Sequence, residues 1–412
     1  MYASIWSYPW DLEDMGIAYA LKDMKEHNLT GVSLITSYHA GRFLQIRSGR
    51  RKVYFPEDGV LYYPSDLSRF RGQRIQPRVG RFIQEHPGFW DNVFNEAAKL
   101  NMSVSGWTVC LHNTRIGMSC EDTCVHNAYG DPVYYNQCPS NPDVRLYMKT
   151  LVDDLCSVLP LYSLELESMN YMGHAHEYHH EKDGIGLTGL DDFLFSLCFC
   201  DSCVKRAKSE GIDILPAKKT VRSWIDAICT RDIPRNQDRE FLQRGFAFFQ
   251  DTPEVYDYLR WRSTVVTSLV QETAQAVQGR SRLYFLSLLP HSRSWLFGVD
   301  LKGIAGICDG AVVCSYDSDT KQAAADLRES RRDFGKNAEL LVGMRAFWPE
   351  YSGQEPFREK VLAAREQGVD GYLFYNYGLI PAAHLDWVKN ALDALIHAGR
   401  MPPVPPSYQD GS

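Results

Sequence analysis

Apolar and polar residues follow a repeating order along this chain, in which a short apolar run precedes a longer amphipathic segment. The apolar runs have the composition of buried strands and lie at 2–6, 31–36, 103–111, 162–167, 283–289, 310–316, 339–344 and 371–375. The amphipathic segments have a helical period and lie at 13–27, 90–100, 144–155, 254–277, 299–307, 320–334, 355–367 and 383–395. The pattern therefore predicts alternating strands and helices.

Eight strands that each lead to a helix are the number found in a closed parallel (β/α)8 barrel, the TIM barrel. An open doubly wound sheet is the alternative, but no strand is followed by the Gly-rich phosphate loop typical of that fold. We expect one α/β barrel over residues 1–400. The Pro-rich segment 401–412 has no apolar periodicity, which predicts a loosely attached tail.

Long insertions follow the second, third and fourth predicted strands. They span roughly 50, 30 and 85 residues, where ~2–6 is usual for a turn between strand and helix. In a barrel these loops lie on the C-terminal face, where catalysis occurs. We expect them to narrow the barrel mouth into a closed pocket; a homo-oligomer interface is the alternative use of the same loops.

The composition excludes several classes of partner. The chain has 412 residues and a net charge of −7 without a basic run, which argues against nucleic acid. No apolar run reaches the ~20 residues needed to cross a bilayer, and the first residues lack the pattern of a signal peptide. The 11 cysteines are an odd number, and we interpret them as reduced thiols and metal ligands of a cytoplasmic protein.

Polar and aromatic side chains gather where the predicted strands end. A buried strand should not end in this way unless its end lines a polar pocket. The residues expected to contact a ligand there are Trp6, His39, His112, Asn113, Arg115, Glu165, Asn170, Tyr171, His174, His176, Arg345 and Asn376.

Glu165 and Glu167 alternate with leucines in the fourth strand, so both carboxylates point to the same face. We expect that face to be the barrel interior, with Glu167 nearer the pocket and Glu165 deeper, beside a basic or hydrogen-bonding neighbour. A structural ion-pair network is the alternative role. The following segment, 174–182, concentrates four histidines; it is a metal site, a sugar-binding loop or an exposed loop.

Cys198, Cys200 and Cys203 form a C-x-C-x-x-C turn that can direct three sulfurs at one centre. Cys138, in a Pro-flanked loop, is the best candidate for the fourth ligand of a tetrahedral zinc site. Four thiolates would leave no open position for water, so the zinc would be structural. Buried or redox-active thiols are the alternative.

These cysteines carry a resemblance to a known family. The stretch CFCDSC at 198–203 resembles the zinc loop of glycoside hydrolase family 42 β-galactosidases, and CPSNP at 138–142 matches the segment that supplies the fourth thiolate. The resemblance implies a barrel, a structural zinc and a Glu acid at the end of strand four, where Glu167 is the nearest match. The family's second Glu ends strand seven, but this strand ends in Arg345, so Asp317 and Glu350 are the candidates for the second carboxylate.

The sequence thus predicts a glycoside hydrolase-like enzyme that cleaves a small glycoside, with Glu167 as acid/base and Asp317 or Glu350 as its partner. One alternative is a metal-dependent sugar isomerase or lyase that uses the histidine segment. The other is a carbohydrate-binding barrel without catalysis, because strand seven lacks its carboxylate.

Overall fold

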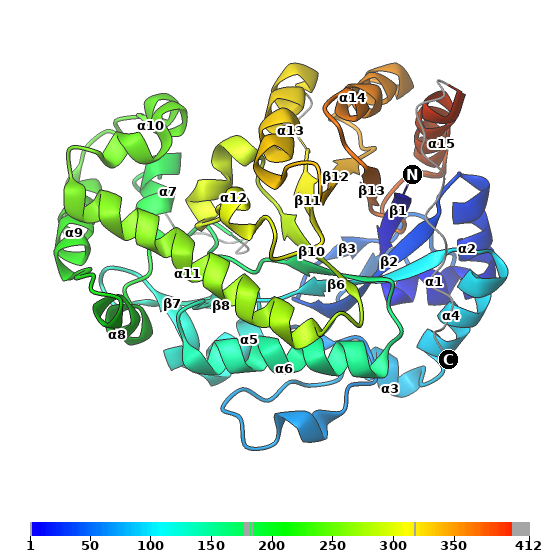
Figure 1. The fold of residues 1–412 in the computed structure, drawn as a ribbon, viewed down its shortest axis with the longest axis horizontal. Coiled ribbons are helices and arrows are strands. Elements are labelled where there is room, and N and C mark those ends of the chain that lie inside the picture. The colour runs from blue at the N-terminus through cyan, green and yellow to red at the C-terminus, as the bar shows by residue number, and fades with distance from the viewer. Residues whose placement is uncertain (1, 177–181, 183, 317–318, 398–412) are drawn as a thin grey trace.

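A computed structural model describes residues 2–176, 182, 184–316 and 319–397 of the chain. Its centre is a closed parallel barrel, because the strand order β1-β13-β12-β11-β10-β9-β6-β2 returns to its start through a β1–β2 pairing. The barrel strands are β1 (Tyr2–Ser7), β2 (Gly31–Tyr38), β6 (Ser103–Val109), β9 (Ser163–Glu167), β10 (Arg282–Ser287), β11 (Gly310–Cys314), β12 (Glu339–Arg345) and β13 (Gly371–Tyr375). This confirms the predicted (β/α)8 fold, and all eight predicted strands are present (Figure 1).

Helices surround the barrel on the outside (Figure 1). They are α1 (Pro9–Met15), α2 (Ile17–Glu26), α3 (Arg81–Glu85), α4 (Phe89–Lys99), α5 (Thr114–Ser119), α6 (Pro142–Val158), α7 (Gly189–Phe195), α8 (Asp201–Ser209), α9 (Leu215–Thr230), α10 (Asp238–Arg244), α11 (Pro253–Val277), α12 (Leu301–Ile304), α13 (Thr320–Phe334), α14 (Gln354–Glu366) and α15 (Ala382–His397). The predicted helix 13–27 is two helices, because Gly16 between α1 and α2 has φ 87°, a conformation that ends a helix. None of the described helices is long and apolar enough to cross a membrane.

Short strands and 3-10 turns occupy the insertions. The hairpins are β3 (Phe43–Leu44) with β4 (Val53–Tyr54), and β7 (Cys124–His126) with β8 (Pro132–Gln137), while β5 (Val60–Leu61) adds antiparallel to β2. The turns are η1 (Leu67–Phe70), η2 (Glu121–Thr123), η3 (Gly245–Phe249) and η4 (His291–Phe297). These elements follow β2, β6, β9 and β10, on the C-terminal side of the barrel, where the sequence predicts the pocket.

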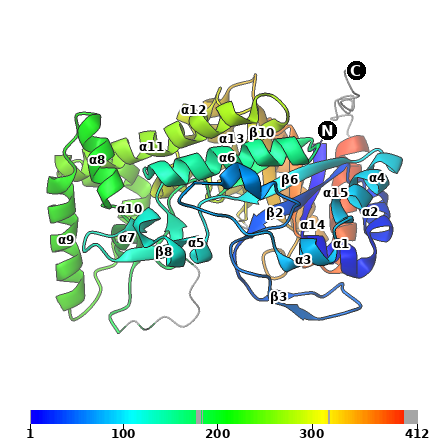
Figure 2. The same ribbon diagram turned by 90° about the horizontal axis from the view of Figure 1, so that it is seen from below.

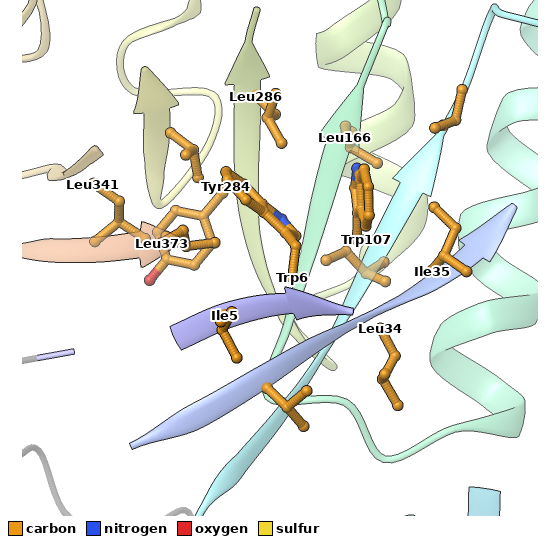
Figure 3. Close-up of a cluster of buried hydrophobic side chains, with 14 of the residues drawn as sticks. Ile5, Trp6, Leu34, Ile35, Trp107, Leu166, Tyr284, Leu286, Leu341 and Leu373 are labelled. Atoms are coloured by element: carbon orange, nitrogen blue, oxygen red, sulfur yellow. The ribbon is translucent and has the colours of Figure 1, made fainter. Parts of the chain in front are cut away.

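Two hydrophobic clusters support this arrangement. The larger one fills the barrel and the layer between strands and helices, and Figure 3 shows Trp6 of β1 and Trp107 of β6 close together among the aliphatic side chains of the strands. The second cluster packs α7, α8, α9 and α11 around Cys138, Cys198, Cys200 and Cys203. In Figures 1 and 2 the helices α7, α8 and α9 lie to one side of the barrel, around one end of α11.

Candidate active site and cysteine cluster

Glu165 and Glu167 both point into the barrel from β9. Glu165 is completely buried, whereas Glu167, the last residue of the strand, is 8% exposed. The inward direction and the relative depth of the two carboxyls are those that the alternation with leucine predicts. Glu167 therefore lies at the C-terminal end of the barrel, and Glu165 lies one layer below it.

Tryptophan side chains from two other strands hold these carboxyls. The indole Nε1 of Trp107 donates a hydrogen bond to Oε2 of Glu167. The indole Nε1 of Trp6 donates to Oε2 of Glu165 at 2.7 Å, and the Ser33 hydroxyl donates to the same oxygen at 2.8 Å. Trp6 was predicted to contact a ligand, but its polar atom is used inside the barrel.

Burial raises the pKa of both carboxyls. The pKa of Glu165 is raised to about 7, because desolvation and the Glu167 charge outweigh the hydrogen bonds from Ser33 and Trp6. Desolvation also raises the pKa of Glu167, against the opposing hydrogen bond from Trp107 and the charge of His39. A carboxyl that keeps its proton near neutral pH can act as a general acid.

Three tyrosine hydroxyls form a connected group beside Glu167. Tyr8 Oη lies 3.0 Å from Tyr38 Oη and 2.9 Å from Tyr375 Oη. The Glu167 charge contributes to the raised pKa values of Tyr38 and Tyr375, both of which are raised first by burial. Tyr8 and Tyr375 were not predicted as site residues, although they lie just beyond the end of β1 and at the end of β13.

Histidines from three loops extend this group of tyrosines into a wall of aromatic side chains. The His39 ring stacks on Tyr38 at 4.2 Å between centroids and on His112 at 4.0 Å, and His176 meets His112 edge-on at 4.8 Å. Three predicted ligand residues, His39, His112 and His176, are thus brought together. His174 is not part of this group, because it is exposed and packs against Phe195 at 5.1 Å.

Arg345, the last residue of β12, forms an ion pair with Glu350 in the following loop. The Arg345 guanidinium also lies 4.4 Å from the ring centre of Tyr316. Desolvation raises the pKa of Glu350 despite the arginine, and within the described residues its Oε2 has no hydrogen-bond partner. Asp317, the other predicted partner of Glu167, lies outside the described residues.

Several predicted ligand residues hold loops in place. Asn113 caps α5 by accepting from the Ile116 amide at 2.9 Å, and Arg115 donates to the Gly59 carbonyl at 3.0 Å. Asn376 is fully buried and accepts from the Gly378 amide at 3.1 Å. These structural contacts account for the polar residues that follow the strands, and none of the contacts requires a bound ligand.

Asn170 and Tyr171 lie between the barrel and the insertion helices. Asn170 Nδ2 donates to the Tyr171 carbonyl at 2.5 Å. The Tyr171 hydroxyl lies 3.9 Å from Cys203 Sγ, and the Arg262 guanidinium lies 4.1 Å from the centre of its ring. Tyr171 therefore packs against the cysteine cluster rather than against the histidines.

The four predicted zinc ligands converge on one point. Cys138 follows β8, and Cys198, Cys200 and Cys203 lie around the start of α8. Their four sulfurs lie within 4.8 Å of one another, all four residues are buried, and none is in a disulfide. In the described part of the chain, no other group of three or more histidine, cysteine or acidic side chains is close enough to hold a metal ion.

The sulfur spacing fits a tetrahedral zinc ion. Cys138 Sγ lies 3.5 Å from both Cys200 Sγ and Cys203 Sγ, and 3.8 Å from Cys198 Sγ. The sulfurs of Cys198 and Cys203 are 3.6 Å apart. A Zn–S bond of ~2.3 Å in a tetrahedron places its sulfurs about 3.8 Å apart. Burial raises the pKa of Cys138 and Cys198, so thiolates here need a cation to stabilise them. The donor set therefore fits zinc.

No family model matches the chain, and no curated protein matches it in sequence. Similar solved structures are glycoside hydrolases. The PgaB (BpsB) glycoside hydrolase domain from Bordetella bronchiseptica is 12% identical with a TM-score of 0.55, over 96% of this chain and 98% of that one. A β-galactosidase from the psychrophilic Marinomonas ef1 is 10% identical with a TM-score of 0.57, over 97% and 60%. An endo-1,4-β-mannanase from Rhizomucor miehei is 9% identical with a TM-score of 0.51, over 96% and 95%. At these identities the likeness is one of fold.

Proposed function

We propose that this chain is a glycoside hydrolase that uses Glu167 as its general acid/base. The observation that carries the proposal is the setting of Glu167: a carboxyl with a raised pKa, at the C-terminal end of a barrel strand, beside a wall of tyrosines and histidines. Trp107 engages only Oε2 of this carboxyl, which leaves Oε1 for proton transfer. The glycoside hydrolases of similar fold support the reaction class.

The mechanism requires a second carboxylate across the scissile bond. Glu167 would donate its proton to the glycosidic oxygen as the bond to the anomeric carbon breaks. A second carboxylate would either attack that carbon, at a carboxyl separation of ~5 Å, or activate a water, at ~6.5–9.5 Å. We assign this role to Glu350 or Asp317. Glu350 is supported by its partial burial and by its free oxygen beside Arg345.

His39, His112, His176 and Arg345 would bind the sugar hydroxyls. They come from different loops, which supports a narrow pocket that accepts a small glycoside or the end of a chain. Digestion of a long polysaccharide tests the shape of the site. A pocket releases only small products early, whereas the early appearance of mixed mid-length oligosaccharides would contradict it.

We also propose that Cys138, Cys198, Cys200 and Cys203 hold a structural zinc, and that the chain is related to family 42 β-galactosidases through this site. When bound, the ion would link the loop after β8 to the insertion helices. The four thiolates leave no coordination position for a substrate, so the metal supports the fold and does not react. Metal analysis of the purified protein should give about one zinc per chain.

A panel of aryl glycosides tests the enzymatic proposal. The wild-type chain should release the aryl group from at least one sugar, and Glu167→Gln should abolish most of that release. Asp154→Asn is the control, because Asp154 is a fully buried carboxylate outside the proposed site that accepts hydrogen bonds from Tyr63 and Ser65 on the outer layer of the barrel. Equal rates in the wild type and Glu167→Gln would refute the role of Glu167.

A binding protein without catalysis is the second candidate. It is favoured by one observation: β12 ends in Arg345, which is engaged in an ion pair with Glu350, the candidate second carboxylate. In that case, calorimetry would detect sugar binding while every aryl glycoside remained intact. A metal-dependent isomerase or lyase would instead require a second metal per chain in the same metal analysis.

A further inference from the structure

Glu165 is a buried carboxyl that the proposed reaction does not use. It is fully buried beneath Glu167, so it cannot touch a substrate at the mouth of the barrel. Buried acidic side chains are rare unless they are paired or serve a function. Its position two residues before Glu167 on the same strand face links it to the proposed active site.

Burial and one unpartnered oxygen favour the neutral form of Glu165, against the two hydrogen bonds that it accepts. Oε2 accepts both hydrogen bonds, from Trp6 and Ser33, while Oε1 has no partner among the described residues. An ionised carboxylate offers about four acceptor sites, and an unpartnered charged oxygen in an apolar core is strongly disfavoured. A protonated carboxyl carries no charge, so it needs fewer hydrogen bonds and no counter-charge to be buried at low cost.

The groups that face Glu165 do not offer a counter-charge. On β9 the neighbouring titratable group is Glu167, on β1 it is Tyr2, and on β11 it is Cys314. Strand β2 contributes the Ser33 hydroxyl, and β6 contributes the Trp107 ring opposite Glu165. Within the described residues, no lysine, arginine or histidine contributes to the electrostatics of Glu165.

A chain of contacts leads from Glu165 to Glu167. Glu165 anchors the Trp6 indole, the Trp6 ring lies 5.9 Å from the Trp107 ring, and the Trp107 indole donates to Glu167. We propose that Glu165 is a positioning residue that holds the Trp6 indole beside Trp107 from below and that, through its own charge when it ionises, sets the acid strength of Glu167. This inference rests on the proposed function of Glu167.

Glu165→Gln separates the charge from the contacts, because the amide oxygen still accepts from Trp6 and Ser33. In the wild type, ionisation of Glu165 places a negative charge near Glu167 and makes Glu167 hold its proton to higher pH. The variant lacks that charge. We therefore expect the alkaline limb of its kcat/KM profile to move to lower pH by about half a unit or more. An unmoved limb would overturn the proposal.

Two companion variants sharpen the test. Ser33→Ala removes one donor to Glu165 and thereby favours its neutral form, so the limb should move in the same direction by less. Asp154→Asn should leave the limb in place while changing a buried carboxylate to an amide in the same way. If Asp154→Asn shifts the limb as far as Glu165→Gln does, the effect is not specific to Glu165 and the proposal fails.

Infrared difference spectroscopy tests the same idea without a substrate. At pH 6 the wild type should show a protonated-carboxyl band that Glu165→Gln lacks, and the band lost in Glu167→Gln should titrate at lower pH in Glu165→Gln. Absence of the first band, or an unshifted second one, would overturn the role of Glu165. If both spectral results hold and no glycoside is cleaved, the proposed function fails while the coupling of the two carboxyls stands.

Discussion

The carboxyl pair inside the barrel and the four cysteines beside it are both buried polar clusters, but they are stabilised differently. Glu165 and Glu167 lie on one strand and accept hydrogen bonds from Trp6, Ser33 and Trp107. The cysteines come from loops up to 65 residues apart, and much of their contact is with one another. The chain thus supplies hydrogen-bond donors to the two carboxyls, whereas the four thiols, as the proposed zinc site, would be stabilised by a bound ion.

The largest effect should come from Glu167→Gln, which removes the proposed proton donor and keeps the shape of the side chain. Loss of a general acid typically lowers turnover by ~10²–10⁴-fold. Steady-state kinetics on substrates with poor leaving groups measures this, because such substrates depend most on protonation. Retention of near-wild-type rates on those substrates would show that another group is the acid.

Loss of a proposed zinc ligand should reduce stability more than it reduces turnover. Cys200→Ser removes one of four thiolates and should lower the zinc content and the free energy of unfolding, by at least about 3 kcal/mol. Thermal unfolding and metal analysis measure the two quantities. Cys229→Ser is the control, because Cys229 is exposed and is not in the cluster. If Cys200→Ser and Cys229→Ser are equally stable and retain equal zinc, the structural zinc site is ruled out.

Stability should fall as pH rises from about 4.5 to about 7. The pKa values of Glu165 and Asp11 are each raised to about 7 by burial, so the folded chain binds protons that the unfolded chain has already released. The stability contributed by each proton is complete below the unfolded pKa and is lost as pH approaches the folded pKa. For Glu165 this amounts to roughly 3 kcal/mol. Denaturant unfolding of Glu165→Gln should show a shallower slope over this range, and an identical slope would contradict the raised pKa.

A smaller effect is expected from Trp107→Phe. The ring is kept, but the indole donor to Glu167 is lost, and that donor lowers the pKa of the carboxyl. The alkaline limb of the pH profile should therefore move to higher pH, opposite to the shift in Glu165→Gln. Turnover should fall by roughly tenfold, as expected for one charge-assisted hydrogen bond. A shift to lower pH would mean that the ring, and not the N–H group, governs Glu167.

Much of the architecture could be predicted from local patterns. The period of the apolar runs gives the eight barrel strands, because residues buried on both faces of a parallel strand must be almost continuously apolar. The alternation of Glu165 and Glu167 with leucines gives their common face, and the spacing of Cys198, Cys200 and Cys203 gives three of the four converging sulfurs. The predicted ends of the strands agree less well with the structure. For example, β11 ends at Cys314, whereas the predicted strand ended at residue 316.

The amino-acid sequence by itself thus determined the order of the strands, the inward carboxyls and the cysteine set, because each depends on residues that are close in the chain. Only the tertiary structure decided which partners they meet. Trp6 reaches Glu165 across 159 residues, and Tyr8 reaches Tyr375 across 367. These contacts exist because the closed barrel places β1 beside β13 and directs side chains of β1 and β9 into the same interior. No local pattern encodes that juxtaposition, and for the same reason Tyr171, next to the predicted site in sequence, packs against the cysteines instead.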